Sequence, residues 1–574
     1  PVPADLFQLS AAEFGSAAEN IVLERRYPEL GPREQTVERS HADMTAGARI
    51  EPNDRLTAEF SYRFGRTGVR NTQFNRLDRS NFDVALDTSL CAATPGCVPI
   101  NPFLIGGITE GAGDFLRAPP LHRRIFLEEH ELSARVSVDV DGPFPETAYA
   151  TGGLDLRRTR FGDGSVNPNF GDVGGAFLSN DLKGALSVIE GFAALNAPLL
   201  RSSVVGDLDL SIAGRVTGSS QYGPAHNIEA AADWSPTEGL RFFGKAHAGR
   251  RPPNIIEMFN VDEAVHATFF DPCGESLTSM SETVAENCFG DGALSVSDGF
   301  KQTAPLAKVS FVGNPDLEPE RIWSGAYGVA IAPTSMFRGI DGDMRISATW
   351  LSHKIENIVG AIEAPLAACY SSPGFSSPAC GVNPHTGLPL INRDPTSEQI
   401  VAIEWLMMNG AAYKWKGLDF QFDYVIEPAG FGPIDRLWVS GLHTLALRVE
   451  STVLGNLTAQ RLDGQAADPR NRSRASIGGE AGPIALNLYF QRRGRVATLP
   501  GAPFPETKIP AVSTIDLTTR LKIGDKAVAT FAVENLTDRD APLAAFAGGA
   551  GGNTFPEHYD LIGRRFSIGL KVAM

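Results

Sequence analysis

The chain has 574 residues, of which 43% are hydrophobic and 21% charged, with a formal net charge of −16. Its 59 Gly and 39 Pro residues exceed average usage and exclude a long helical repeat, while the negative charge argues against a nucleic-acid partner. No run approaches 18 apolar residues, so no transmembrane helix is predicted.

The first 32 residues lack the alternating pattern that follows, and the opening PVPADLFQLS has neither the basic nor the apolar region of a signal peptide. From position 33 onward, apolar and polar residues alternate over runs of nine to 17 residues. In one such run, Ile515 and Leu517 alternate with Asp516. Seventeen strands are predicted, near 33–50, 56–66, 129–140, 146–158, 187–197, 205–218, 225–235, 239–250, 320–332, 343–357, 410–427, 434–453, 471–481, 484–494, 512–523, 526–536 and 562–572.

Strands of a β-sandwich average about six residues. Runs of ten or more, with Arg and Lys repeatedly on the second face, instead favour an all-β fold: a transmembrane antiparallel β-barrel with a wet lumen. The connections alternate between short turns, such as 51–55, and three long stretches at 67–128, 251–319 and 358–409. Outer-membrane barrels have this asymmetry, with short periplasmic turns and long extracellular loops.

Six cysteines form three local pairs, one in each of the three longest loops. This placement predicts disulfides in an oxidising compartment. The expected bonds are Cys91–Cys97, Cys273–Cys288 and Cys369–Cys380. Zinc binding is the competing interpretation, but the sequence has no CxxC and no His at ligand spacing from these pairs. We therefore expect neither a metal nor a cofactor.

An odd number of strands has a consequence for the whole barrel. Bacterial single-chain barrels have an even number of strands, so seventeen strands predict that others precede residue 33. Five further strands would give 22, the size of plugged outer-membrane transporters. Residues 1–32 are then expected to be the tail of an extracellular loop, and residues 33–574 the C-terminal strands of the barrel, without the plug domain.

Several segments together resemble a known family. They are LERRYPELGPR (23–33), GCVPINPF (96–103), RRPPNIIEMF (250–259), DPC (271–273), ENC (286–288), NPDLEPE (314–320), VENLTDRDA (533–541) and RRFSIGLKVAM (564–574). The chain resembles the C-terminal part of a TonB-dependent outer-membrane receptor, of the large type common in alphaproteobacteria. Two departures stand out: nothing resembles the plug or its TonB box, and the last residue is Met574 instead of the usual aromatic residue.

The resemblance places Arg251 at the barrel mouth, near where ligand enters. The alternative is a structural ion pair between Arg251 and a carboxylate of a loop or plug. Phe269 and Phe270 are loop aromatics that can stack on a sugar. The loop 252–313 has nine acidic residues against Lys301 and Lys308, which suits a cationic ligand, a solvated surface, or ion-bridged contact with lipopolysaccharide.

Tryptophan residues near predicted strand ends are expected to form aromatic girdles at the membrane interfaces. They are Trp234, Trp323, Trp350, Trp405, Trp415 and Trp438, joined by Tyr327. Lumen-facing polar residues such as Arg241, Lys245 and Arg493 are expected to meet complementary groups on a plug. G-x-S-x-G and H-E-x-x-H motifs are both missing, so no enzyme is predicted.

The resemblance implies TonB-dependent uptake of a scarce nutrient, such as a siderophore, vitamin, oligosaccharide or peptide, across the bacterial outer membrane. This chain would be the barrel wall and extracellular loops. Its partners would be a plug-bearing portion or second chain, TonB–ExbB–ExbD acting through the plug, outer-membrane lipid, and a small nutrient. A passive large-pore porin is the first alternative, and a secreted β-sandwich adhesin or glycan-binding protein is the second.

Overall fold

A computed structural model describes most of the chain. The described residues are 28–102, 104, 107–165, 173–174, 178–179, 182–274, 280–289, 300–302, 306–336, 341–362, 364–428, 432–454, 459–465, 468–497, 508–543, 554–555 and 558–572. The expected loop tail at 1–32 lies largely outside them.

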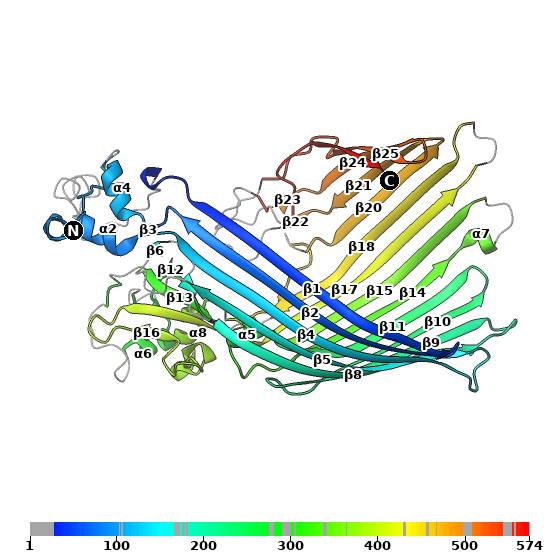
Figure 1. The fold of residues 1–574 in the computed structure, drawn as a ribbon, viewed down its shortest axis with the longest axis horizontal. Coiled ribbons are helices and arrows are strands. Elements are labelled where there is room, and N and C mark those ends of the chain that lie inside the picture. The colour runs from blue at the N-terminus through cyan, green and yellow to red at the C-terminus, as the bar shows by residue number, and fades with distance from the viewer. Residues whose placement is uncertain are drawn as a thin grey trace.

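In the described part of the chain, seventeen strands paired in chain order form one curved antiparallel sheet (Figure 1). They are β1 (Glu34–Asn53), β2 (Leu56–Phe74), β4 (Leu121–Val140), β5 (Ala148–Ser165), β8 (Leu182–Leu200), β9 (Asp207–Ser219), β10 (Ala225–Thr237), β11 (Leu240–Arg251), β14 (Glu320–Ile331), β15 (Asp343–Ala361), β17 (Ile400–Ile426), β18 (Arg436–Thr452), β20 (Asn471–Ala481), β21 (Ile484–Arg493), β24 (Val512–Ile523), β25 (Ala527–Glu534) and β26 (Arg565–Val572). Each pairs with the next long strand along the chain. The predicted seventeen strands and the barrel-type fold are confirmed.

Several strands are longer at one end than their alternation predicts. β4 begins at Leu121 and β17 at Ile400, eight and ten residues before the predicted starts, and β2 continues to Phe74. All three extensions lie at the end of the sheet that carries the long loops, and two of them are apolar on both faces: in β4 the adjacent Phe126 and Leu127 are both exposed, and in β17 Ile400 and Ile403 are both buried. The period-two pattern therefore fades there, although the backbone pairing continues. We call this end the loop end, and the opposite end, with the short connections, the turn end.

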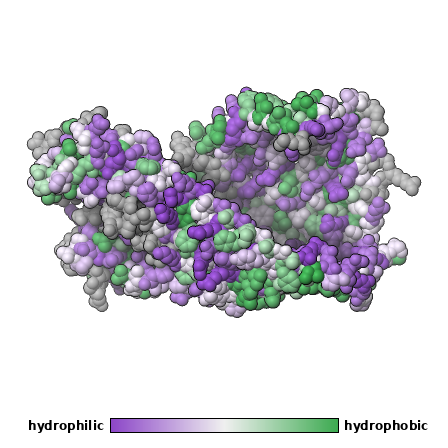
Figure 2. Space-filling view, viewed as in Figure 1, coloured by the Kyte–Doolittle hydropathy of each residue, from purple (hydrophilic) through white to green (hydrophobic). Residues whose placement is uncertain are grey.

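The two faces of the sheet differ in polarity, as the alternation predicts. Leu154, Ile228 and Phe242 are exposed on one face, which we call the apolar face. The opposite, polar face carries the ion pair of Lys245 with Glu229, at 2.8 Å. Figure 2 shows hydrophilic residues lining the hollow side of the sheet, with hydrophobic residues gathered on its outer sides. This is the arrangement of a barrel wall around a wet lumen.

Basic side chains of the polar face find carboxylates within the wall itself. Besides Lys245, Arg63 donates to Asp43 at 2.9 Å, and Arg241 forms an ion pair with Asp233. Arg241 and Lys245, which the sequence predicts to meet a plug, thus already have carboxylate partners in the wall. The charge of the lumen wall is thus partly balanced before any plug is considered.

The predicted aromatic girdle is only partly realised. Trp234, Trp323, Trp350 and Tyr327 are exposed on the apolar face. The other three tryptophans are elsewhere. Trp405 packs edge-on against Phe311, 5.0 Å away, among the loops, while Trp415 and Trp438 alternate to the polar face. Trp415 is out of phase with Leu418 and Phe420, which lie on the apolar face of the same strand, so the alternation itself places Trp415 on the polar face.

Two lobes are built from the long connections at the loop end, at the left of Figure 1. The helical lobe contains η1 (Pro28–Leu30), α2 (Arg79–Leu86), α3 (Thr88–Ala93) and α4 (Glu110–Leu116), with β3 (Leu77–Asp78) and β6 (Val173–Gly174) beside it. Its small core includes Leu30, Ala85 and Leu116.

The second lobe, which we call the disulfide lobe, is centred on a small sheet that continues β17. Its strands are β7 (Leu178–Ser179), β12 (Val261–Thr268), β13 (Leu306–Val312) and β16 (Ile391–Arg393), and its helices are α5 (Ile255–Phe259), η2 (Pro272–Gly274), α6 (Glu282–Phe289), α8 (Pro365–Tyr370), η3 (Pro373–Phe375) and η4 (Pro378–Cys380). β13 pairs with β17 in parallel and β16 pairs with it antiparallel. The remaining short elements are α7 (Pro333–Met336), β19 (Gln460–Arg461), β22 (Val496–Ala497) and β23 (Lys508–Ile509).

Candidate ligand-binding mouth

Arg251 ends β11 at the loop end and holds two carboxylates. Its guanidinium donates to Glu320 (Nε to Oε2, 2.7 Å) and to Glu257 (Nη2 to Oε1, 3.0 Å). Glu320 is buried and also accepts from the backbone N–H of Val359 at 2.9 Å. A planar guanidinium suits two carboxylates in one plane. The ion-pair interpretation therefore describes the observed contacts of Arg251, and its contact with ligand stays a prediction.

Both carboxylates are set by local sequence. Glu257 completes a capping box with Asn254 at the start of α5, where a carboxylate accepts from the free N–H groups of the first turn. Glu320 ends the segment NPDLEPE (314–320), whose backbone is held by Asn409: the N–H of Glu318 donates to Oδ1 of Asn409 at 2.8 Å. The segment that carried the family resemblance thus fixes the acceptor for Arg251.

Arg393 joins three separated segments inside the disulfide lobe. It donates to both carboxylate oxygens of Asp271, at 2.7 and 2.8 Å, and to the hydroxyl of Tyr370 at 2.8 Å. Its guanidinium also lies 5.5 Å from the ring centre of Phe300. The Asp271 side chain is 0% exposed. Such a pair is stable only when nearly all its hydrogen-bonding capacity is used, which is the case here.

Burial changes the pKa values of Tyr370 and Arg393 in this cluster. Removal from water raises the pKa of Tyr370, although the nearby Arg393 charge opposes the change. Burial is the largest single effect and lowers the pKa of Arg393, but the hydrogen bonds and charges of Asp271 and Tyr370 together outweigh it, so the net pKa is raised. Tyr370 is therefore a neutral donor and acceptor, and Arg393 a permanent cation, at physiological pH.

Phe269 and Phe270 are adjacent but differently placed. Phe269 packs against the core of the disulfide lobe, and its carbonyl accepts from Nε2 of Gln302 at 3.0 Å. Phe270 is 94% exposed. Of the two, Phe270 exposes its ring at the surface while Phe269 packs inside the lobe, and contact of either ring with a ligand stays a prediction.

All three predicted disulfides are present. Cys91–Cys97 closes the helical lobe, while Cys273–Cys288 and Cys369–Cys380 lie in the disulfide lobe. The Cα atoms of the three pairs are 5.2, 5.5 and 5.1 Å apart. Within the described residues no group of three or more His, Cys, Asp or Glu side chains is arranged to hold a metal ion. None of the described helices has the length and hydropathy to cross a membrane.

Sequence reasoning missed Arg393 and Asp271. Asp271 lies in the acidic loop 252–313, and Arg393 lies 122 positions further along the chain. The only signal in the sequence is the DPC segment (271–273), which places this Asp beside a disulfide. Its partner is fixed by the lobe's tertiary packing.

Comparison with known proteins agrees with this architecture. The family model for TonB dependent receptor-like β-barrels matches residues 12–536, and no curated protein matches the sequence significantly. Similar solved structures include the siderophore receptor PirA from Acinetobacter baumannii (10% identity, TM-score 0.50, covering 93% of this chain and 71% of that one). Another is a ferric enterobactin receptor, PfeA from Pseudomonas aeruginosa (13% identity, TM-score 0.53, covering 93% and 70%).

A third is the Serratia marcescens hemophore receptor HasR in complex with its hemophore and heme (13% identity, TM-score 0.50, covering 95% and 67%). At these identities the likeness shows the fold. The family match covers most of the chain, and members of this family are transport receptors of the outer membrane. The seventeen-strand sheet excludes the β-sandwich alternative, and the chain belongs to the TonB-dependent receptor-like β-barrel family.

Proposed function

We propose that this chain forms the wall and extracellular loops of a receptor that takes up a scarce nutrient across the outer membrane, with the loop end facing outward. The observation that carries the proposal is the contrast between the two ends of the sheet. Two packed lobes closed by disulfides lie at the loop end, whereas the turn end has mostly short connections. Disulfides form outside the cytosol, and rigid lobes at a barrel mouth suit ligand capture.

In this proposal a plug, carried by a further portion of the receptor or by a second chain, fills the lumen. TonB, with ExbB and ExbD, pulls on that plug from the periplasm. Because the similar structures are receptors for siderophores, ferric enterobactin and a heme-carrying hemophore, iron complexes are the first ligands to test. Vitamins, oligosaccharides and peptides are the further classes.

The test compares uptake of a labelled ferric siderophore or heme in cells with and without the intact receptor, and with and without TonB. We expect uptake that requires both. Uptake that survives loss of TonB, together with porin-like conductance of the complete receptor in planar bilayers, would favour the passive pore. A 22-strand ring conducts unless something fills it, so the complete receptor is expected to be closed.

A matched pair of variants tests the mouth. Arg251→Ala is expected to weaken ligand binding roughly tenfold or more, as for loss of charged hydrogen bonds. Arg201 is the control, because it also binds two carboxylates, Glu146 at 3.0 Å and Asp209 at 2.7 Å, but lies at the turn end. Arg201→Ala should leave ligand affinity unchanged, and equal losses in both variants would assign Arg251 a purely structural role.

A further inference from the structure

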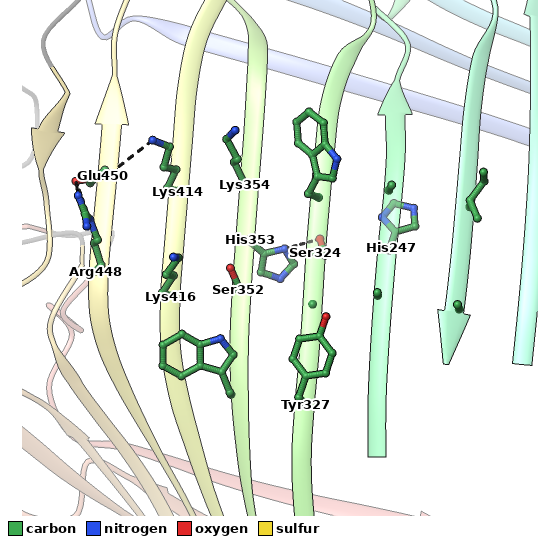
Figure 3. Close-up of a pocket in the computed structure, with 17 residues that line it drawn as sticks. His247, Ser324, Tyr327, Ser352, His353, Lys354, Lys414, Lys416, Arg448 and Glu450 are labelled. Atoms are coloured by element: carbon green, nitrogen blue, oxygen red, sulfur yellow. Dashed lines mark hydrogen bonds and ion pairs between the residues drawn. The ribbon is translucent and has the colours of Figure 1, made fainter. Parts of the chain in front are cut away.

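Four basic side chains lie together on the apolar face, where a barrel contacts lipid. They are Lys354, Lys414, Lys416 and Arg448, and we call them the basic patch. The register sets Lys354 opposite Trp323 and Lys414, and Lys416 opposite Arg448. Since alternate residues of a strand point to opposite faces, all four share the face of Trp323. Figure 3 shows them on the adjacent strands β15, β17 and β18.

A groove of about 850 Å³ lies against the basic patch. Its lining includes the small residues Ala246, Ala248 and Gly325, and the rings of Tyr327 and Trp350. Small side chains on neighbouring strands leave a hollow where larger ones would cover the sheet. The groove therefore offers apolar walls beside a group of cations, as a lipid with a charged headgroup requires.

The basic patch lies at the level of a membrane interface. Tyr327 pairs with Trp350, one step nearer the turn end than Lys416. Further toward the turns, the apolar-face positions of β15 and β17 become aliphatic and aromatic, as at Ile346 and Phe420. Tyr and Trp concentrate where headgroups meet hydrocarbon. Cations just outside such an aromatic row are at the depth of lipid phosphates.

Protein carboxylates only partly balance these charges. Glu450 accepts from Arg448 at 2.6 Å and lies 3.9 Å from Lys414. Glu356 forms an ion pair with Lys354. Lys416 has neither an ion-pair nor a hydrogen-bond partner within the described part of the chain.

Two more arginines extend the positive surface. Arg250 and Arg321 face each other across β11 and β14, and Arg321 pairs with Glu356 in the row just above the patch. The six basic and two acidic side chains named here carry a summed charge of +4, in a chain whose net charge is −16. An excess of cations at this depth calls for anions from outside the protein.

We propose that the basic patch binds the phosphorylated headgroup of lipopolysaccharide, the glycolipid of the outer leaflet, with an acyl chain along the groove. The patch spans two interstrand spacings, about 10 Å, so its cations reach more than one phosphate. This favours a glycolipid with several phosphates over a phospholipid with one. The inference rests on the proposed outward orientation of the loop end.

The test uses the full-length receptor, purified in detergent, and measures its affinity for purified lipopolysaccharide. We expect Lys354→Gln/Lys416→Gln to weaken binding roughly thirtyfold, from the typical contribution of two basic residues near an anionic surface. Lys354→Arg/Lys416→Arg should retain affinity. Arg241→Gln/Lys245→Gln is the matched control, because it removes the same charge from the polar face of neighbouring β11 and should leave binding unchanged.

Two further probes identify the ligand. Chemically dephosphorylated lipopolysaccharide should bind the wild type as weakly as native lipopolysaccharide binds the Gln variant, and phosphatidylglycerol should bind more weakly than lipopolysaccharide. The proposal would be overturned if the wild type and the Gln variant bound lipopolysaccharide with equal affinity. It would also be overturned if the wild type bound phosphatidylglycerol as tightly as it binds lipopolysaccharide. If the double variant does not assemble, as judged by heat-modifiable migration, Lys416→Gln alone provides the comparison. The assay involves no uptake, so its failure is separable from failure of the proposed function.

Discussion

Arg251 and Arg393 each hold more than one acceptor, and neither position suits a lysine. Arg251 bridges Glu257 and Glu320, and Arg393 binds Asp271 through two parallel hydrogen bonds while also donating to Tyr370. A guanidinium offers five donors in a fixed plane, whereas an ammonium is a compact point charge. The excess of arginine over lysine in this chain, 40 against 11, is consistent with such bidentate contacts.

Removing Arg393 should loosen the disulfide lobe. Arg393→Ala leaves the Asp271 carboxylate buried without its counter-ion, which typically costs about 3–5 kcal/mol. Because the lobe is a separate packed unit, we expect the loss to appear as faster amide hydrogen exchange in α8 and β16, with little effect on barrel strands. Mass spectrometry of exchanged peptides makes the measurement.

Arg345→Ala is the control for this variant. Arg345 forms an ion pair with Asp343 at 3.6 Å, and the two side chains are 72% and 63% exposed. Exposed pairs contribute about 0–1 kcal/mol, so exchange should stay unchanged. If α8 and β16 were protected from hydrogen exchange equally well in Arg393→Ala and in the wild type, Asp271 would have to find another partner.

At the scale of elements, β17 connects the wall to the mouth. It is 27 residues long, and its first residues pair with β13 on one side and β16 on the other, while its later residues pair with β15 and β18. A strand is stiff along its length when both edges are hydrogen-bonded. β17 therefore joins the disulfide lobe to the part of the wall between β15 and β18 through continuous backbone pairing.

The two disulfides of this lobe should determine its stability. Cys273–Cys288 spans 15 residues, a loop whose closure is expected to stabilise by roughly 3 kcal/mol in the chain-entropy account. We expect Cys273→Ser/Cys288→Ser to increase cleavage of the disulfide lobe in limited proteolysis. Cys91→Ser/Cys97→Ser, which opens a bond in the helical lobe, should leave that cleavage unchanged. Similar cleavage patterns for both variants would mean that the lobes are not independent.

At the scale of the whole molecule, the sheet has two open edges. Among the described residues β1 pairs only with β2, and β26 only with β25. An unpaired backbone N–H or C=O in hydrocarbon costs several kcal/mol. We therefore propose that further strands, from the same precursor or from a second polypeptide, pair with both edges and complete the barrel.

This proposal predicts the behaviour of the chain in isolation. Residues 1–574, refolded alone in detergent, should not give the heat-modifiable gel migration of a closed barrel, whereas the receptor isolated from membranes should. Native mass spectrometry of that receptor should find additional polypeptide. A closed barrel composed of one chain of 61.4 kDa and nothing else would contradict the proposal.

The sequence alone determined the strands, their order and the two faces, because period-two alternation is a local property that survives wherever lipid lies on one side and water on the other. It also determined the disulfides, since the partners in each pair are close in sequence. The tertiary structure decided the contacts between residues that lie far apart in the sequence. Arg393 meets Asp271 only when the disulfide lobe packs, and Trp405 leaves the girdle because β17 extends past the barrel. Likewise, Lys354, Lys416 and Arg448 become one patch only through the register of three strands.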